Sequence, residues 1–165
     1  WESAINLNRI SAKALSGDQQ FLKKYEEARK KWAPKTSAET YYSLIEVVVC
    51  LQNKAMDNAL KIANESIKFA NKHKVMFAVG YAYCFKAIAL DGLDRKKEAL
   101  EAFIEAIKIC KKQKSKWIEL YVSEAFRSFL LKENNDISYY NEIEDIHILT
   151  NHSLTLIKKQ NLVLS

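Results

Sequence analysis

Small and apolar residues recur along this chain with the spacing of helices that bury one face. In the segment 99–107 an Ala, a Phe and an Ala stand at offsets of 0, 4 and 7, which puts them on one side of a helix. The segment 59–67 has small residues at the same offsets, and 21–28 has a Phe, a Tyr and an Ala. The three segments start 38 and 40 residues apart. The pattern predicts a repeating unit of about 40 residues.

Each of these helices follows another apolar helix, so the repeating unit is a helix pair. The preceding helices are predicted at 5–15, 41–51 and 75–90, with Gly92 in one of the turns and Pro34 between the first two pairs. A fourth pair begins near Trp117. Helix pairs that stack in chain order form an α-solenoid, so we predict an all-α protein of about four antiparallel pairs. The predicted pairs lie within 1–136, at about 1–33, 37–74, 75–114 and, for the first helix of the fourth pair, 117–132.

The fourth pair continues as a long C-terminal helix over 137–165. From Tyr139 to Leu164, residues on its apolar side follow the four-three spacing of a coiled-coil seam, interrupted by polar residues. This helix either caps the solenoid or serves as a coiled-coil linker through which two copies dimerise. The chain begins with Trp instead of Met, and the last helix has no stop signal. We therefore interpret these residues as one part of a larger protein.

Composition agrees with an all-α fold. The chain has three Gly and one Pro, where an average protein of 165 residues would have about eleven and about eight. This shortage of turn residues excludes sandwiches, barrels and doubly wound α/β folds. The apolar content of 48% with a net charge of only +6 argues against disorder.

The third pair resembles the tetratricopeptide (TPR) family. The first helix of a TPR carries a large, a small and a further large residue, which match Tyr83, Ala87 and Leu90. The second helix carries an Ala, an aromatic and an Ala, which match Ala99, Phe103 and Ala106. Lys86 and Ala87 replace the family's usual Leu and Gly, and no Pro ends the repeat. The period of about 40 residues exceeds the usual 34 or so, and is similar to that of longer-helix TPR domains in bacterial regulatory and sensor proteins.

The resemblance implies a binding face, because the first helix of each TPR pair lines the concave side of the solenoid. Carried over residue by residue, this face consists of Tyr41, Leu44, Val48, Tyr81, Cys84, Ile88, Asp91, Glu119, Val122 and Phe126. Such a surface is mostly apolar and suits a short helix or an apolar peptide. Alternatively, the C-terminal helix folds back over these residues and they are core.

The resemblance favours a non-catalytic, protein- or peptide-binding regulatory module from a bacterial signalling protein. Two alternatives remain open, namely a peptide-pheromone-binding domain of a transcription regulator and a structural adaptor that dimerises through 138–165. Chaperone-binding TPR domains hold a carboxylate with Lys, Arg and Asn at inner positions, and the second and third pairs have none of these there. The Asn side chains typical of pheromone receptors are likewise missing from the inner positions of pairs two to four.

No motif in the chain points to catalysis, a metal or a cofactor. Glu144 and His147 form one Glu-x-x-His, but a di-iron bundle needs two such motifs and two more Glu. His147 and His152 stand about 140° apart around a helix and do not share one metal. Glycine is too scarce for a phosphate-binding loop. We therefore predict that the protein is not an enzyme and holds no metal or cofactor.

The predicted location is the cytoplasm. The N-terminal residues lack the basic and apolar segments of a signal peptide, and the longest apolar run, 47–51, is far shorter than the roughly 20 residues of a membrane span. Cys50, Cys84 and Cys110 stand far apart in apolar surroundings, as is typical of reduced thiols.

Lysines form a basic patch at the end of the helix near 110, made of Lys108, Lys111, Lys112, Lys114 and Lys116. Cations near the C-terminus of a helix interact favourably with its dipole, which explains the patch without a partner. The alternative is an acidic partner or a nucleic-acid backbone. Because Lys outnumbers Arg 22 to 4, and Arg is the preferred base reader, nucleic acid is disfavoured.

Overall fold

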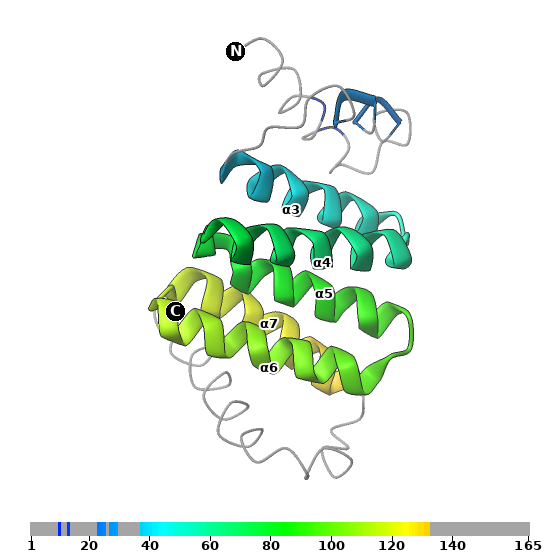
Figure 1. The fold of residues 1–165 in the computed structure, drawn as a ribbon. Helices are drawn as coiled ribbons and strands as arrows, with labels where there is room; N and C mark the ends of the chain where they lie inside the picture. Colours follow the sequence, from blue (N-terminus) through cyan, green and yellow to red (C-terminus); the bar gives the residue numbers. More distant parts are fainter. Residues whose placement is uncertain (1–9, 11–12, 14–22, 26, 30–36, 133–165) are drawn as a thin grey trace, which may run out of the picture.

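A computed structural model describes residues 10, 13, 23–25, 27–29 and 37–132 of the chain (Figure 1). The continuous part contains α3 (Ser37–Gln52), α4 (Met56–His73), the short 3-10 helix η1 (Met76–Ala78), α5 (Val79–Gly92), α6 (Lys96–Gln113) and α7 (Lys116–Lys132). Over the described residues all regular structure is helical, with no strand, which confirms the all-α class for this part of the chain. The C-terminal helix predicted at 137–165 and most of the first predicted pair lie outside the described residues.

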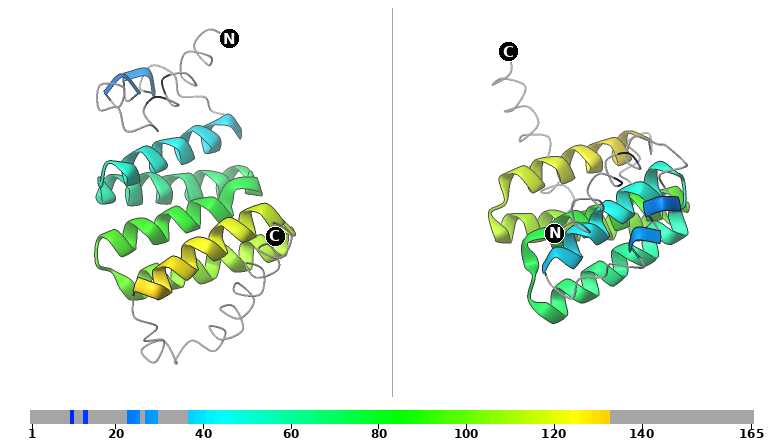
Figure 2. Two further views of the ribbon diagram at one scale, coloured as in Figure 1. Left: turned by 180° about the vertical axis from the view of Figure 1, so that it is seen from behind. Right: turned by 90° about the horizontal axis from the view of Figure 1, so that it is seen from above.

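Helices that follow one another in the chain pack side by side. In Figure 1, α3, α4, α5 and α6 follow one another down the molecule, and α7 lies against α5 and α6. The helix α5 also contacts α3 and α7, so it has neighbours on several sides (Figure 2). Its sequence fits this place, because residues 79–90 include only one charged side chain, that of Lys86. A helix that is apolar all round is one that is covered all round.

The same turn ends four successive helices. Lys54, Lys74, Asp94 and Lys114 are all left-handed, with φ between 55° and 59°, and they are spaced by 20 residues each time. In each turn the next residue donates its backbone N–H to the carbonyl five residues earlier, as from Val75 to Ala70 at 2.9 Å. This is the hydrogen bond of a Schellman helix end. Gly92 was expected in a turn, but it is the last residue of α5, and Asp94 supplies the left-handed conformation.

Two clusters of buried side chains form the core and share α5. One lies between α5, α6 and α7, and the other between α3, α4 and α5. Burial follows the same 40-residue interval, since each of the five buried residues of α4 has a buried counterpart on α6: Ala59 and Ala99, Ala63 and Phe103, Ser66 and Ala106, Ile67 and Ile107, Ala70 and Cys110. The small residues among them let α4 and α6 approach closely the helices on which they pack, α3 and α5 for α4, and α5 and α7 for α6.

Candidate functional site

An apolar groove of about 280 Å³ lies between α3 and α5. Four of its residues come from α3, at spacings of three and four that place them on one face of that helix: Tyr41, Leu44, Ile45 and Val48. Four more come from η1 and α5, namely Phe77, Ala78, Tyr81 and Phe85. Ile118 of α7 completes the lining. We call this set the apolar groove.

The groove has buried walls and two exposed aromatic residues. Leu44, Ala78 and Phe85 are buried, whereas Tyr41 and Phe77 remain 52% and 56% exposed. Large aromatic side chains that stay half exposed beside an apolar hollow are available to a partner, because covering them removes further apolar surface from water.

An aromatic cluster forms one wall. The rings of Tyr81 and Phe85 are stacked, with centroids 6.0 Å apart and planes at 19°. Tyr121 of α7 meets both edge-on, at 5.3 Å from Tyr81 and 6.1 Å from Phe85. Burial raises the pKa of Tyr121 above its ordinary value, so this hydroxyl stays neutral at physiological pH.

Four of the ten residues predicted for the binding face line the groove, namely Tyr41, Leu44, Val48 and Tyr81. Three others, Cys84, Val122 and Phe126, are fully buried in the cluster between α5, α6 and α7. Ile88 is half-buried and packs against both clusters. Apart from the four groove residues, the predicted face therefore contributes mainly to the core.

The two predicted acidic residues are held in ion pairs. The Asp91 carboxylate, near the end of α5, lies 2.6 Å from Lys96 Nζ and 3.0 Å from Lys132 Nζ. Burial alone would raise the pKa of Asp91, but hydrogen bonds from the two ammonium groups outweigh it and lower the pKa below its ordinary value. Glu119 is fully buried and accepts a hydrogen bond from Lys116 at 3.1 Å.

The predicted residues of α7 are out of register by two positions. The left-handed residues before α5 and α7, Lys74 and Lys114, are 40 residues apart. Tyr121 of α7 therefore corresponds to Tyr81 of α5, and Glu119 corresponds to Val79. Both Glu119 and Val79 are buried. The residue of α7 that meets the groove's aromatic wall is therefore Tyr121, which the sequence reasoning did not select.

Five groove residues were not predicted from the sequence: Ile45, Phe77, Ala78, Phe85 and Ile118. Ile45 stands four residues after Tyr41, so helical spacing would have found it. Phe77 and Ala78 belong to η1, which is too short to give a periodic signal.

A second cavity, of about 520 Å³ and with both polar and apolar lining residues, lies beside α3 and α4, next to Tyr25 and Arg29. The Arg29 side chain is 9% exposed and bonds to Glu39 at 2.8 Å and Glu46 at 3.2 Å. Burial alone would lower the pKa of Arg29, but the hydrogen bond to Glu39 and the two carboxylates raise it. The Tyr25 hydroxyl donates to the Tyr42 carbonyl at 3.1 Å. These contacts attach Tyr25 and Arg29 to α3.

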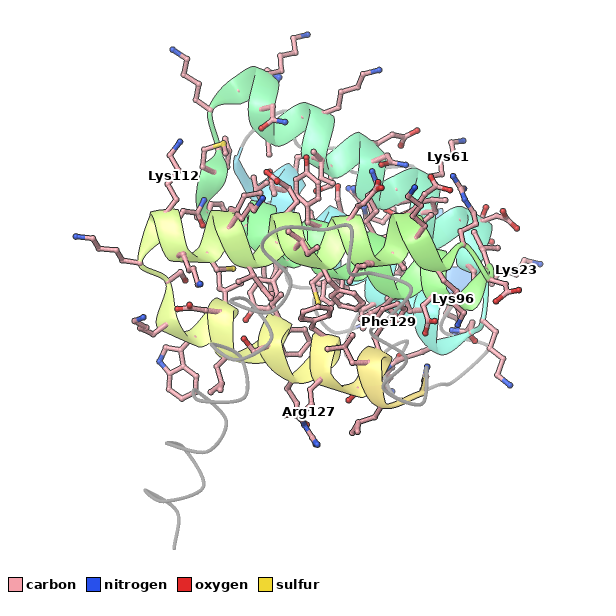
Figure 3. All side chains as sticks on the ribbon, turned by 90° about the horizontal axis from the view of Figure 1, so that it is seen from below. Lys23, Lys61, Lys96, Lys112, Arg127 and Phe129 are labelled. Carbon is pink, nitrogen blue, oxygen red and sulfur yellow. The ribbon has the colours of Figure 1, made fainter. Side chains whose placement is uncertain are left out.

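The predicted basic patch lies at the C-terminal end of α6 and in the turn to α7. Lys108, Lys112, Lys114 and Lys116 are exposed and Lys111 is half-buried. Figure 3 shows Lys112 at one end of the helices, with Lys61 and Lys96 toward the other end.

The buried thiols are poor nucleophiles. Burial raises the pKa of Cys84, and it raises that of Cys110 to about 12, so both stay protonated near pH 7. Among the described residues, no three His, Cys, Asp or Glu side chains come together as a possible metal site. None of the described helices combines the length and the apolar character that crossing a membrane requires.

Comparison with known proteins found no matching family model, no matching curated protein and no matching solved structure. A function is therefore to be argued from the groove and its surroundings.

Proposed function

We propose that this chain is a non-catalytic, TPR-like regulatory module that binds a protein segment or peptide in the apolar groove. The observation that carries the proposal is the groove itself, an apolar hollow with Tyr41 and Phe77 half exposed beside it. Peptide-binding surfaces take most of their binding energy from a few apolar or aromatic side chains that enter such hollows.

The repeat supports the TPR-like arrangement. The left-handed turns recur every 20 residues, and Tyr41, Tyr81 and Tyr121 stand at 40-residue intervals on α3, α5 and α7. A solenoid of helix pairs repeats its turns and its face residues in this way, because each pair packs on the previous one with the same geometry.

The size of the groove suits side chains better than a whole small molecule. Small-molecule pockets span about 300–1,000 Å³, and this groove of about 280 Å³ is at the lower limit of that range. It has room for one or two apolar side chains of a longer segment. Each apolar side chain buried there contributes about 1.5–3 kcal/mol before the costs of ordering the segment.

The test uses peptides selected from a random library on the immobilised wild-type protein, with affinities then measured by fluorescence titration. Tyr41→Ala and Phe77→Ala should each weaken binding about tenfold, since either removes a ring beside the groove. Leu131→Ala is the matched control, because Leu131 is 51% exposed on α7 and does not line the groove. Thermal unfolding checks that each variant folds.

Two outcomes would contradict the proposal. One is that the wild-type protein enriches no peptide. The other is that the selected peptides bind Tyr41→Ala, Phe77→Ala and Leu131→Ala equally well, which would place their site elsewhere.

A further inference from the structure

Exposed lysines gather at the end of the helices where α4 and α6 finish. Lys72 and Lys112 lie in the last turns of these two helices, and Lys74 and Lys114 are the left-handed residues just beyond them. The members of each pair are 40 residues apart, so both repeats place lysine at the same two positions. We call these four residues the lysine edge.

Acidic residues are missing from the sequence around the lysine edge. No Asp or Glu occurs in 66–90 or in 106–118. The ion pairs between described residues engage other cations, and at this end Glu119 is bound by Lys116. The lysine edge therefore carries positive charge that its own neighbours in the sequence do not offset.

Helix-dipole stabilisation does not explain why the lysines gather at this end. Every α-helix favours a cation in its last turn. At the other end, however, α3 and α5 have no basic residue in their last turns, and α7 has Lys132, whose charge is paired with Asp91. The last turns of α4 and α6 each have two. A stabilising role alone would distribute basic residues evenly over the ends of the five described α-helices.

The lysine edge adjoins the apolar groove. Lys74 precedes Phe77 by three residues, so their Cα atoms lie at most about 11 Å apart. The Gln113 side chain donates to the Met76 carbonyl at 2.6 Å, which ties the end of α6 to η1. Trp117, 80% exposed, precedes the groove residue Ile118. Charges at such distances act on a bound segment, because the Debye length is about 10 Å at 0.1 M salt.

We infer that the groove's partner is an acidic amphipathic segment, whose apolar side chain enters the groove while neighbouring Asp or Glu residues meet the lysine edge. The inference rests on the proposed function and adds the charge of the partner. An anionic lipid surface would also combine negative charge with apolar groups. The apolar groove between helices accommodates a single protruding side chain better than it accommodates a flat bilayer surface. We therefore argue for a peptide as the partner.

The experiment compares peptides selected from the random library with the unselected library. Selected sequences should be enriched in Asp and Glu close to an aromatic or large aliphatic residue. A selected peptide is then titrated against the wild-type protein and two triple variants. The first variant reverses charge at the lysine edge (Lys72→Glu, Lys74→Glu, Lys112→Glu), and the control makes the same change elsewhere (Lys54→Glu, Lys61→Glu, Lys97→Glu).

The first triple variant should weaken binding at least about tenfold at low salt, since several exposed ion pairs of modest strength are lost together. The control should change affinity less than about twofold, because it has the same net charge as the first triple variant but keeps the positive charge of the lysine edge. Binding to the wild-type protein should also weaken as salt rises. A version of the first variant with Gln in place of Glu removes the positive charges without adding negative charges at two helix ends. It should give an intermediate loss of affinity, and it controls for misfolding caused by the added Glu residues.

The outcomes separate the inference from the proposed function. Selected peptides without acidic enrichment, or equal losses in the two triple variants, overturn the inference and leave the groove as a binding site. Failure to enrich any peptide overturns both. Binding to phosphatidylserine vesicles that requires the lysine edge, with no peptide enriched, replaces the peptide with a membrane surface.

Discussion

Replacing the left-handed lysines with glycine is expected to stabilise the protein. Lys54, Lys74 and Lys114 have φ values of 58°, 56° and 55°, where a Cβ crowds the following carbonyl oxygen at a cost of about 1–2 kcal/mol. Glycine avoids that cost but loses about 0.5–1 kcal/mol more through its greater freedom in the unfolded chain. The net gain is about 0.5–1 kcal/mol at each site, and about 2 kcal/mol for the triple variant if distant sites add.

Urea unfolding followed by circular dichroism measures the effect. The transition midpoint of the triple variant should rise with an unchanged m-value, because the surface exposed on unfolding stays the same. Lys61→Gly and Lys68→Gly are matched controls in exposed parts of α4, where Gly should cost about 1 kcal/mol. If Lys74→Gly destabilises the protein as much as Lys61→Gly does, residue 74 continues the helix and the repeated turn is refuted.

Three further measurements test the packing and charges. Gly80→Ala should cost about 1–3 kcal/mol, because the added Cβ would lie 2.6 Å from Cys110 Sγ; adding Cys110→Ala should recover part of that loss in a double-mutant cycle. Since the pKa of Asp91 is lowered in the folded state, its stabilising contribution is present above its ordinary pKa of about 3.9 and is lost as pH falls through the folded value; Asp91→Asn and Lys132→Ala should each flatten the acid limb of the stability profile. Under native conditions iodoacetamide should label the half-buried Cys50 before Cys110, whose pKa burial raises to about 12, as mass spectrometry of digests would show.

Helix positions were predictable because burial of one face leaves a periodic signal. The apolar spacing that begins at Ala59 and Ala99 marks α4 and α6, whose residues at these positions are all buried. The turn chemistry was less predictable, because Lys has no preference for the left-handed region and nothing local marks Lys54, Lys74 or Lys114 as turn residues. The repeat places them at a 20-residue interval, which is a property of helix packing and not of residue type.

The groove was predictable where the faces of long helices contribute to it, which includes Tyr81 on α5. Tyr41, Leu44 and Val48 follow helical spacing on α3, and the structure brings them together in the groove. The prediction for α7 selected Glu119 instead of Tyr121. A set of positions shifted by two residues along this helix is still mostly apolar, so the pattern did not reveal the error. Phe77 belongs to a three-residue element, so only its place in space reveals its role.

The Tyr81 ring lines the groove between α3 and α5 and also packs against α7. Tyr121 of α7 and Phe85 of α5 both contact the Tyr81 ring. No ring contact among the described residues joins Tyr81 to Tyr41, whose ring instead meets Tyr42 edge-on at 5.3 Å. Among the described residues, no ring bridges Tyr41 and Tyr81 in the way that Tyr121 bridges Tyr81 and Phe85. An aromatic side chain from a partner would contact both rings there, so we expect aromatic residues to be more frequent than large aliphatic ones among the selected peptides.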